Sequence, residues 1–263
     1  MRPQARRPGG VCEGPRVFLK DRLRAGATLR GVIAVIPSAV ATQAMAAAGA
    51  DFVMVDREHG PIGRESLHAM IAATAGTGCA PLVRVPAIVA AEVKLALDAG
   101  AEGVVFPLVR TPADAERCVA LMTYPPAGAR GWGPMVAHSR HNTTLAGYAE
   151  DVAPHLTCCV LLETVEAVEN AEAILAVDGI DLAILAPYDL STALGVPGRF
   201  DAAAFVDAVA AIERAAAARG VPLAGVALTA ERSAALEAAG YRVLVQGIDT
   251  AMLAERVASF RGA

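Results

Sequence analysis

Two acidic side chains and a histidine closely follow an apolar run in this 263-residue chain. The run Phe-Val-Met-Val occupies residues 52–55, and Asp56, Glu58 and His59 come next. A continuous apolar run is typical of a strand that is buried on both faces. Asp56 and His59 could form a pair in which the carboxylate orients the imidazole and raises its basicity, giving a general base near neutral pH. A loop histidine bonded to a carbonyl group is the alternative interpretation.

Two later acids repeat this layout. Glu163 ends an apolar run that begins at residue 157, and Asp189 follows the apolar run 182–186. Two carboxylates, with water and a substrate oxygen, are a usual environment for a hard divalent ion. The same acids are equally consistent with first-turn positions of the helices that follow them.

Arg84 interrupts the apolar segment Pro-Leu-Val-Arg-Val-Pro at 81–86. A guanidinium group inside a core must meet an anion, because an unpaired buried charge is very costly. The anion could be structural, from Asp56 or Glu58. It could also be a substrate carboxylate or enolate, which the planar guanidinium fork fits well.

Alternating apolar and amphipathic segments must position these groups. We expect strands at 31–36, 52–56, 81–85, 103–109, 157–163, 182–186, 222–228 and 242–246. We expect helices at 38–48, 64–76, 89–99, 112–122, 164–176, 201–219, 229–239 and 249–260. Eight βα units over about 240 residues are typical of a single α/β domain folded as a (β/α)8 TIM barrel, whose active site lies at the C-terminal strand ends. The long irregular interval 124–156 is expected to line that site.

Composition excludes several other classes of protein. Hydrophobic residues make up 55% of the chain, but no apolar run is long enough to span a membrane. A net charge of −4 with scattered Lys and Arg argues against a nucleic-acid partner. The five cysteines form no C-x-x-C pair, which favours reduced thiols in a cytoplasmic protein. Residues 1–15 are expected to be a disordered extension, with the catalytic domain at 16–263.

Six motifs occur in the order found in one enzyme family. They are Asp-Arg-Glu-His-Gly-Pro at 56–61, Pro-Leu-Val-Arg-Val-Pro at 81–86, Tyr-Pro-Pro-Ala-Gly-Ala-Arg-Gly at 124–131, Glu-Thr-Val-Glu-Ala-Val-Glu-Asn at 163–170, Gly-Ile-Asp at 179–181 and Pro-Tyr-Asp-Leu-Ser-Thr-Ala-Leu-Gly at 187–195. The chain therefore resembles the HpcH/HpaI aldolases, class II pyruvate aldolases that depend on a metal, from about Leu19 to Phe260.

This resemblance implies roles for the residues discussed above. Glu163 and Asp189 are expected to hold a divalent metal ion, which is Mg²⁺, Mn²⁺ or Co²⁺. His59 is expected to be the catalytic base, with assistance from Asp56, and Arg84 to stabilise an enolate. The resemblance also implies a homo-oligomer, a trimer or a hexamer, in which a C-terminal helix is exchanged between subunits.

The activity implied is that of a carbon–carbon lyase. It would make or cleave the bond between the enolate of a 2-oxo acid such as pyruvate and an aldehyde. Oxaloacetate decarboxylation, or another lyase reaction that forms an enolate, would use the same residues. A catalytically silent barrel is a third interpretation.

Four positions depart from the pattern of the family. Ala186 stands where glycine is usual, Tyr188 where alanine is frequent, and Leu161 where many members have a polar residue. Val89 replaces a frequent aspartate. We expect all three of Ala186, Tyr188 and Leu161 to line the substrate site. The amide of Ala186 can bind the carboxylate of pyruvate although its methyl group takes space, and Tyr188 with Leu161 should make the aldehyde site smaller and less polar.

Overall fold

A computed structural model describes residues 17–261 and contains a closed barrel of eight parallel strands. Each strand pairs with its neighbours in sequence, and the first pairs with the last. The strands are β1 (Leu29–Ala34), β2 (Phe52–Asp56), β3 (Ala80–Arg84), β4 (Gly103–Phe106), β5 (Thr157–Leu162), β6 (Leu182–Leu185), β7 (Leu223–Val226) and β8 (Val243–Ile248). The predicted (β/α)8 barrel is confirmed, whereas the extension expected at 1–15 lies outside the described residues.

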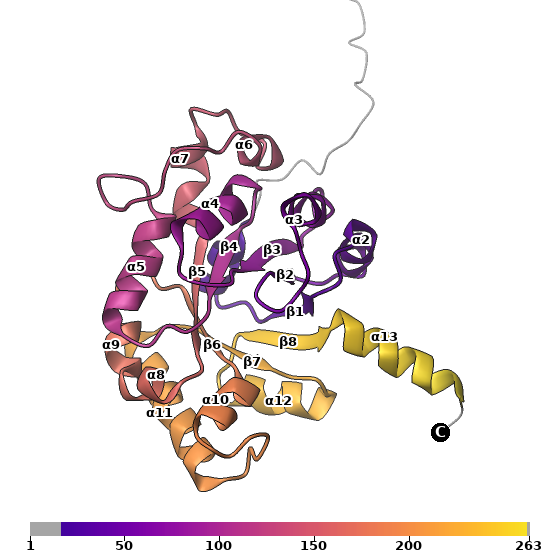
Figure 1. Cartoon of the computed structure of the whole chain (residues 1–263), viewed down its shortest axis with the longest axis vertical. Coiled ribbons are helices and arrows are strands. Elements are labelled where there is room, and N and C mark those ends of the chain that lie inside the picture. Colours follow the sequence, from indigo (N-terminus) through magenta and orange to yellow (C-terminus); the bar gives the residue numbers. More distant parts are fainter. Residues whose placement is uncertain (1–16, 262–263) are drawn as a thin grey trace, which may run out of the picture.

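Helices surround this barrel and bury its outer face (Figure 1). The surrounding helices are α2 (Ala39–Ala47), α3 (Arg64–Ala72), α4 (Ala90–Asp98), α5 (Pro112–Met122), α8 (Val165–Glu169), α9 (Ala171–Leu175), α11 (Ala203–Arg219) and α12 (Ala230–Ala238). The single helix expected at 164–176 is divided at Asn170 into α8 and α9. A short helix, α10 (Pro187–Ala193), was not expected and follows β6 directly.

A second apolar cluster fills the inside of the barrel. Side chains alternate between the two faces of a strand, so every second residue points inward. Phe52 is the largest inward side chain, and Gly31 on β1 makes room for it. A Cβ atom on residue 31 would lie 2.2 Å from the carbonyl oxygen of Phe52 and 2.6 Å from its ring. Glycine is therefore required at this position by close packing.

The N-terminal end of the barrel is closed by a helix that we did not expect. This helix, α1 (Leu19–Arg24), inserts Leu19 and Leu23 into the interior cluster. Its six residues are too few to show a helical period in the sequence. The barrel is consequently open to substrate at the opposite, C-terminal end.

The long interval between α5 and β5 lies at this closed end. It contains α6 (Ala137–Arg140), α7 (Tyr148–Asp151) and the 3₁₀ helix η1 (Ala153–His155). Because it joins the end of a helix to the start of a strand, it belongs to the N-terminal face. Arg140 bonds the carbonyl oxygen of Gly100 and the hydroxyl of Thr74, which precede β4 and β3. The prediction that residues 124–156 line the site was therefore wrong, because this interval lies at the N-terminal end of the barrel and the mouth is at the C-terminal end.

The last helix, α13 (Asp249–Ala258), extends away from the barrel (Figure 1). Asp249 is its only buried residue, and the 3₁₀ helix η2 (Ser259–Arg261) follows it. Large apolar side chains are left exposed along this segment, namely Met252, Leu253, Val257 and Phe260. Over residues 17–261, no helix has the length and apolar character required to cross a membrane.

Candidate active site

A buried ion pair joins the C-terminal ends of β2 and β3. Asp56 and Arg84 are register partners on these strands, and both occupy the uppermost inward layer of the barrel. Nε of Arg84 donates to Oδ1 of Asp56 at 2.9 Å, and Nη2 donates to Oδ2 at 2.5 Å. Burial by itself would raise the pKa of the Asp56 carboxyl, but the hydrogen bonds and charge of Arg84 hold it below its ordinary value. Asp56 is therefore an ionised structural anchor.

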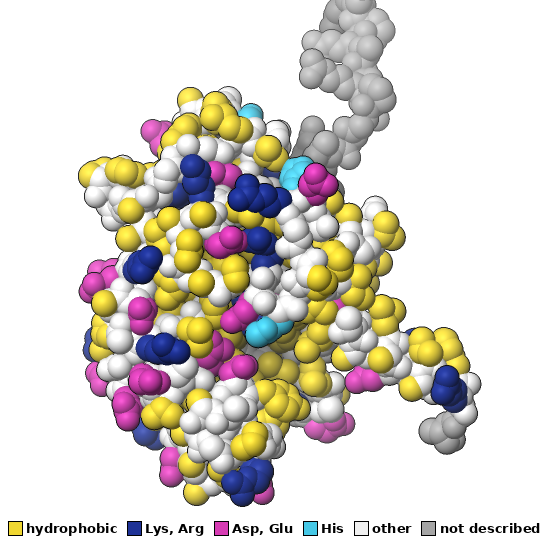
Figure 2. All heavy atoms as spheres, viewed as in Figure 1, with side chains coloured by type: hydrophobic (Ala, Val, Ile, Leu, Met, Phe, Trp, Pro, Cys, Tyr) yellow, Lys and Arg dark blue, Asp and Glu magenta, His cyan; other side chains and the backbone are white. Residues whose placement is uncertain are grey.

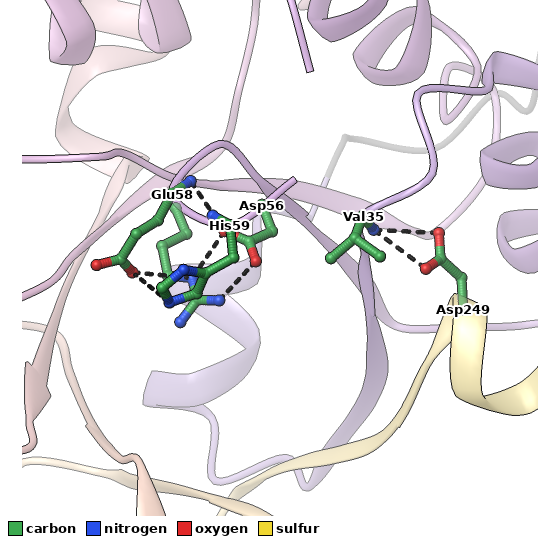
Figure 3. A network of polar contacts seen from close by, with 6 residues as sticks. Val35, Asp56, Glu58, His59 and Asp249 are labelled. Carbon is green, nitrogen blue, oxygen red and sulfur yellow. Dashed lines mark hydrogen bonds and ion pairs between the residues drawn. The ribbon is translucent and has the colours of Figure 1, made fainter. Parts of the chain in front are cut away.

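The same carboxylate shapes the turn that carries His59. Oδ1 of Asp56 accepts the backbone N–H groups of Glu58 at 3.0 Å and His59 at 3.2 Å. The imidazole does not reach Asp56: its Nε2 lies 3.7 Å from Oε2 of Glu58 (Figure 3). We expected the Asp56 carboxylate to orient the imidazole ring, but the ring contacts Glu58 instead. The Asp56 carboxylate is already bonded to the guanidinium group of Arg84. The His59 side chain is 63% exposed at the mouth of the barrel.

Glu58, one of the two structural anions considered for Arg84, is a further member of the site, although the family resemblance implied no role for it. Its Oε2 lies 3.4 Å from Nε of Arg84. Burial raises the pKa of the Glu58 carboxyl, the charges of Arg84 and His59 oppose this, and Asp56 and Asp189 reinforce it. Its position two residues after Asp56 could have indicated that it faces the mouth.

Glu163 follows the last residue of β5 and is almost fully buried. Its Oε1 accepts the backbone N–H of Leu108 at 2.7 Å. Leu108 has a left-handed backbone with φ of 55°, which is uncommon for a residue other than glycine and turns its N–H toward the carboxylate. Burial raises the pKa of the Glu163 carboxyl; the Leu108 N–H lowers it, and the nearby charges of Asp189 and Glu58 raise it further. No sequence signal could have identified Leu108, since only its amide is used.

Asp189 stands in the first turn of α10, which follows β6, and β6 is the neighbour of the strand that precedes Glu163. Ala186 is the N-cap of this helix, and Pro187 begins it. The alternative first-turn interpretation therefore holds for Asp189, whereas Glu163 precedes the N-cap Thr164 of α8. A first-turn position does not remove Asp189 from the site, because its charge still acts on Glu163 and Glu58.

The charges at the mouth do not balance. One guanidinium group, that of Arg84, lies among four carboxylates. The carboxylates are those of Asp56, Glu58, Glu163 and Asp189. In the described part of the chain, no three His, Cys, Asp or Glu side chains are grouped closely enough to enclose a metal ion. Two carboxylates with excess negative charge do fit an ion such as Mg²⁺, which commonly keeps several waters and binds one or two carboxylates.

The other side of the mouth is apolar. Tyr188 is 62% exposed, and its ring meets the edge of Phe200 at 5.1 Å and 82°. Leu161 lies inside the barrel beneath Glu163 and is buried. Val89 is the N-cap of α4 and makes no side-chain cap. Figure 2 shows a hollow in this face that is bordered by acidic and histidine side chains on one side and by hydrophobic side chains on the other.

Fold and site together define a (β/α)8 barrel with an anionic mouth, and comparison with known proteins identifies its family. The sequence model of the HpcH/HpaI aldolase/citrate lyase family matches residues 36–255, and the chain belongs to this family. A hydroxypyruvate/pyruvate aldolase of Roseovarius nubinhibens is 33% identical over 245 residues, which is 92% of this chain and 94% of that protein. A 4-hydroxy-2-oxo-heptane-1,7-dioate aldolase of Salmonella dublin is 33% identical over 239 residues, with 89% of both chains covered.

A solved structure has the same architecture. A member of the HpcH/HpaI aldolase/citrate lyase family from Burkholderia cenocepacia J2315 superposes with a TM-score of 0.86 at 31% identity, covering 92% of this chain and 96% of that one. The chain is accordingly an enzyme of the carbon–carbon lyase class, an aldolase.

The raised pKa of Glu163 predicts how this residue affects stability. For an acid whose pKa is higher in the folded state, stability is greatest below the ordinary value of 4.5 and is lost as pH rises through the folded value. Without metal, Glu163→Gln should therefore raise the melting temperature at about pH 8 and change it little at about pH 4. The amide oxygen of glutamine can still accept from Leu108, so the local hydrogen bond is kept.

Glu169→Gln is the matched control, because Glu169 is an exposed residue of α8. Its melting temperature should follow the wild type at both values of pH. A lower melting temperature for Glu163→Gln at high pH would contradict the assignment of Glu163 as an uncompensated buried charge.

Proposed function

We propose that this aldolase joins or separates a pyruvate-type enolate and an aldehyde with the help of a divalent metal ion. The observation that carries the proposal is the excess of carboxylates around one oriented guanidinium group at the mouth. The printed names of the two aldolase relatives, one acting on hydroxypyruvate or pyruvate and one on a hydroxy-oxo diacid, support the same substrate class.

Glu163 and Asp189 would hold the ion, which is Mg²⁺, Mn²⁺ or Co²⁺. When bound, the ion supplies positive charge that stabilises an enolate. Of the two ligands, Glu163 is the one whose ionised form the metal ion would stabilise more, because burial and two neighbouring acids raise its pKa. The Leu108 N–H holds one carboxylate oxygen, which limits the directions in which the other can point.

Arg84 would donate to the enolate oxygen. Its contacts with described residues use Nε and Nη2, so Nη1 remains to donate to substrate. Because Asp56 holds the guanidinium in a fixed plane, this donor is oriented before substrate binds. The amide of Ala186, at the N-cap of α10, would bind the carboxylate of the 2-oxo acid.

His59 would move the proton. In cleavage it removes the proton from the hydroxyl group next to the bond that breaks. The hydroxyl oxygen becomes the aldehyde carbonyl, and the electron pair of the broken carbon–carbon bond enters the enolate. Protonation of the enolate carbon then gives the 2-oxo acid. In synthesis the same steps run in reverse, and the enolate attacks the aldehyde.

The aldehyde would lie against Tyr188, above the buried Leu161. Phe200 packs on Tyr188 and in turn on Phe205 at 5.2 Å, so the aromatic wall is supported from the core. This apolar side favours short or apolar aldehydes over acidic or polyhydroxylated ones.

The enzyme would act as a homo-oligomer, a trimer or hexamer, in which α13 packs on a neighbouring subunit. The exposed apolar side chains of α13 support this arrangement, because such a face is stable only when covered. A cytoplasmic location is supported by four cysteines that are buried and unpaired: Cys79, Cys118, Cys158 and Cys159.

Exchange of the methyl protons of pyruvate in deuterated water tests the enolate half of the reaction. Chelation should abolish the exchange, and Mn²⁺ should restore it. Arg84→Lys should lower the rate by roughly 10²–10³, the scale for losing one oriented stabiliser of developing charge.

Arg110→Lys is the control, because Arg110 is exposed on the loop after β4. Undiminished exchange and aldol cleavage after complete removal of metal would refute the proposal. Release of CO₂ from oxaloacetate, without aldehyde release from a hydroxy-oxo acid, would instead favour the decarboxylase alternative.

Tyr188→Ala should widen the range of aldehydes and leave pyruvate exchange nearly unchanged. A missing contact in an apolar pocket is worth ~1–3 kcal/mol, so the ratio of kcat/KM for a short aldehyde to that for succinic semialdehyde should change between about tenfold and a few hundredfold. Tyr188→Phe keeps the ring and should leave the ratio near that of the wild type. If both variants have the wild-type ratio, Tyr188 lies outside the aldehyde site.

Val257→Asp should dissociate the oligomer, because it places a charge on the apolar face of α13. Sedimentation velocity should show smaller particles than for the wild type. Val40→Asp makes the same change at an exposed site of α2 and should leave the oligomer intact. Equal sedimentation of wild type and Val257→Asp would remove α13 from the interface.

A further inference from the structure

We propose that Asp249 is a positioning residue for His59, acting through the backbone at the end of β1. The inference rests on the proposed function only in that it takes His59 to be the group that moves the proton. Asp249 is the first residue of α13, which directly follows β8, the strand that pairs with β1.

The Asp249 carboxylate holds the chain where β1 ends. Val35 donates its N–H to both carboxylate oxygens at 3.1 Å, and Ile36 donates to Oδ2 at 3.0 Å (Figure 3). Oδ1 also accepts the N–H of Thr250 at 2.8 Å. Hydrogen bonds to a buried carboxylate are stronger than neutral ones. A side chain thus takes the place of strand pairing, which in β1 ends at Ala34.

Val35 in turn supports the turn that contains His59. A Cβ atom on Gly60 would lie 2.4 Å from the carbonyl oxygen of Asp56 and 3.2 Å from both Cα and the carbonyl oxygen of Val35. Glycine at 60 therefore allows the two backbones to touch. On one side the turn is tied to the Asp56 carboxylate, and on the other it rests on Val35.

The contact between Val35 and the turn at Gly60 matters because packing does not hold the His59 ring. Its side chain is 63% exposed, and its contact with Glu58 is long at 3.7 Å. The place of the imidazole is then set by the backbone that carries it. If Asp249 no longer holds Val35, the surface behind Gly60 can move and the imidazole moves with it. Glu163 and Asp189 follow β5 and β6, away from this contact, and should keep their geometry.

The test compares Asp249→Asn with Asp51→Asn. Asp51 is a matched control at the other end of β1, where its Oδ2 accepts the N–H of Arg30 at 2.8 Å. Each variant replaces, by an isosteric amide, a carboxylate that accepts backbone N–H groups at one end of β1. Asp249→Asn should lower kcat by about tenfold to a hundredfold, since a displacement near 1 Å can cost that much. The KM for pyruvate and the Kd for Mn²⁺ should stay at wild-type values, and Asp51→Asn should keep the wild-type kcat.

A second readout does not depend on turnover. In protein labelled with ¹³C at histidine Cε1, the His59 resonance, assigned with His59→Gln, should shift and broaden in Asp249→Asn and not in Asp51→Asn. Gly60→Ala approaches the same contact from the other side without touching α13, and it should move the same resonance. Gly60→Ala also tests the inference if Asp249→Asn does not fold.

The outcomes separate this inference from the proposed function. A displaced His59 resonance in a protein that has no aldolase activity would refute the function and keep the positioning role. An unchanged resonance and unchanged kcat in folded Asp249→Asn would overturn the inference. The same result in Gly60→Ala would do so as well.

Discussion

The ion pair between Asp56 and Arg84 is the interaction on which the rest of the site depends. It lies inside the top of the barrel, where the register of β2 and β3 places the two residues side by side. Removing one partner of a buried pair leaves an uncompensated charge and typically costs about 3–5 kcal/mol. The pair has two further effects on the site. It holds the guanidinium through Nε and Nη2, and it leaves Asp56 placed to accept the amides of Glu58 and His59.

Arg84 pairs with Asp56 and also lies 3.4 Å from Glu58, so one guanidinium group faces several carboxylates at the mouth. Burial and mutual repulsion raise the pKa values of Glu58 and Glu163. An enzyme that kept this arrangement without a ligand would lose stability near neutral pH. The proposed metal ion would resolve the conflict by supplying positive charge. Strain at Leu108, which turns an amide toward Glu163, is a further local cost that is typical of functional sites.

The pairing of β1 with β8 connects the candidate active site with α13. The barrel closes there, the register of the two strands shifts between Gly31 and Ile33, and α13 departs directly afterwards. Asp249 ties the first residue of that helix to the end of β1, next to the turn of His59. One carboxylate thus bonds both the first turn of α13 and the end of β1. An oligomer built through α13 would place its contacts within reach of the active site.

The amino-acid sequence by itself determined the barrel, because eight apolar runs separated by amphipathic ones have few other ways to be buried. It also determined that acids and an arginine stand at strand ends, since these positions are local. Pairing was decided only by the tertiary structure: Asp56 binds Arg84 and not the His59 ring, because register and burial bring the guanidinium closer. The interval 124–156 lies at the closed end, a matter of connectivity that composition does not show. The hydrogen bond from the Leu108 amide to Glu163 and that from the Val35 amide to Asp249 depend on backbone geometry. Residue types alone do not reveal this geometry.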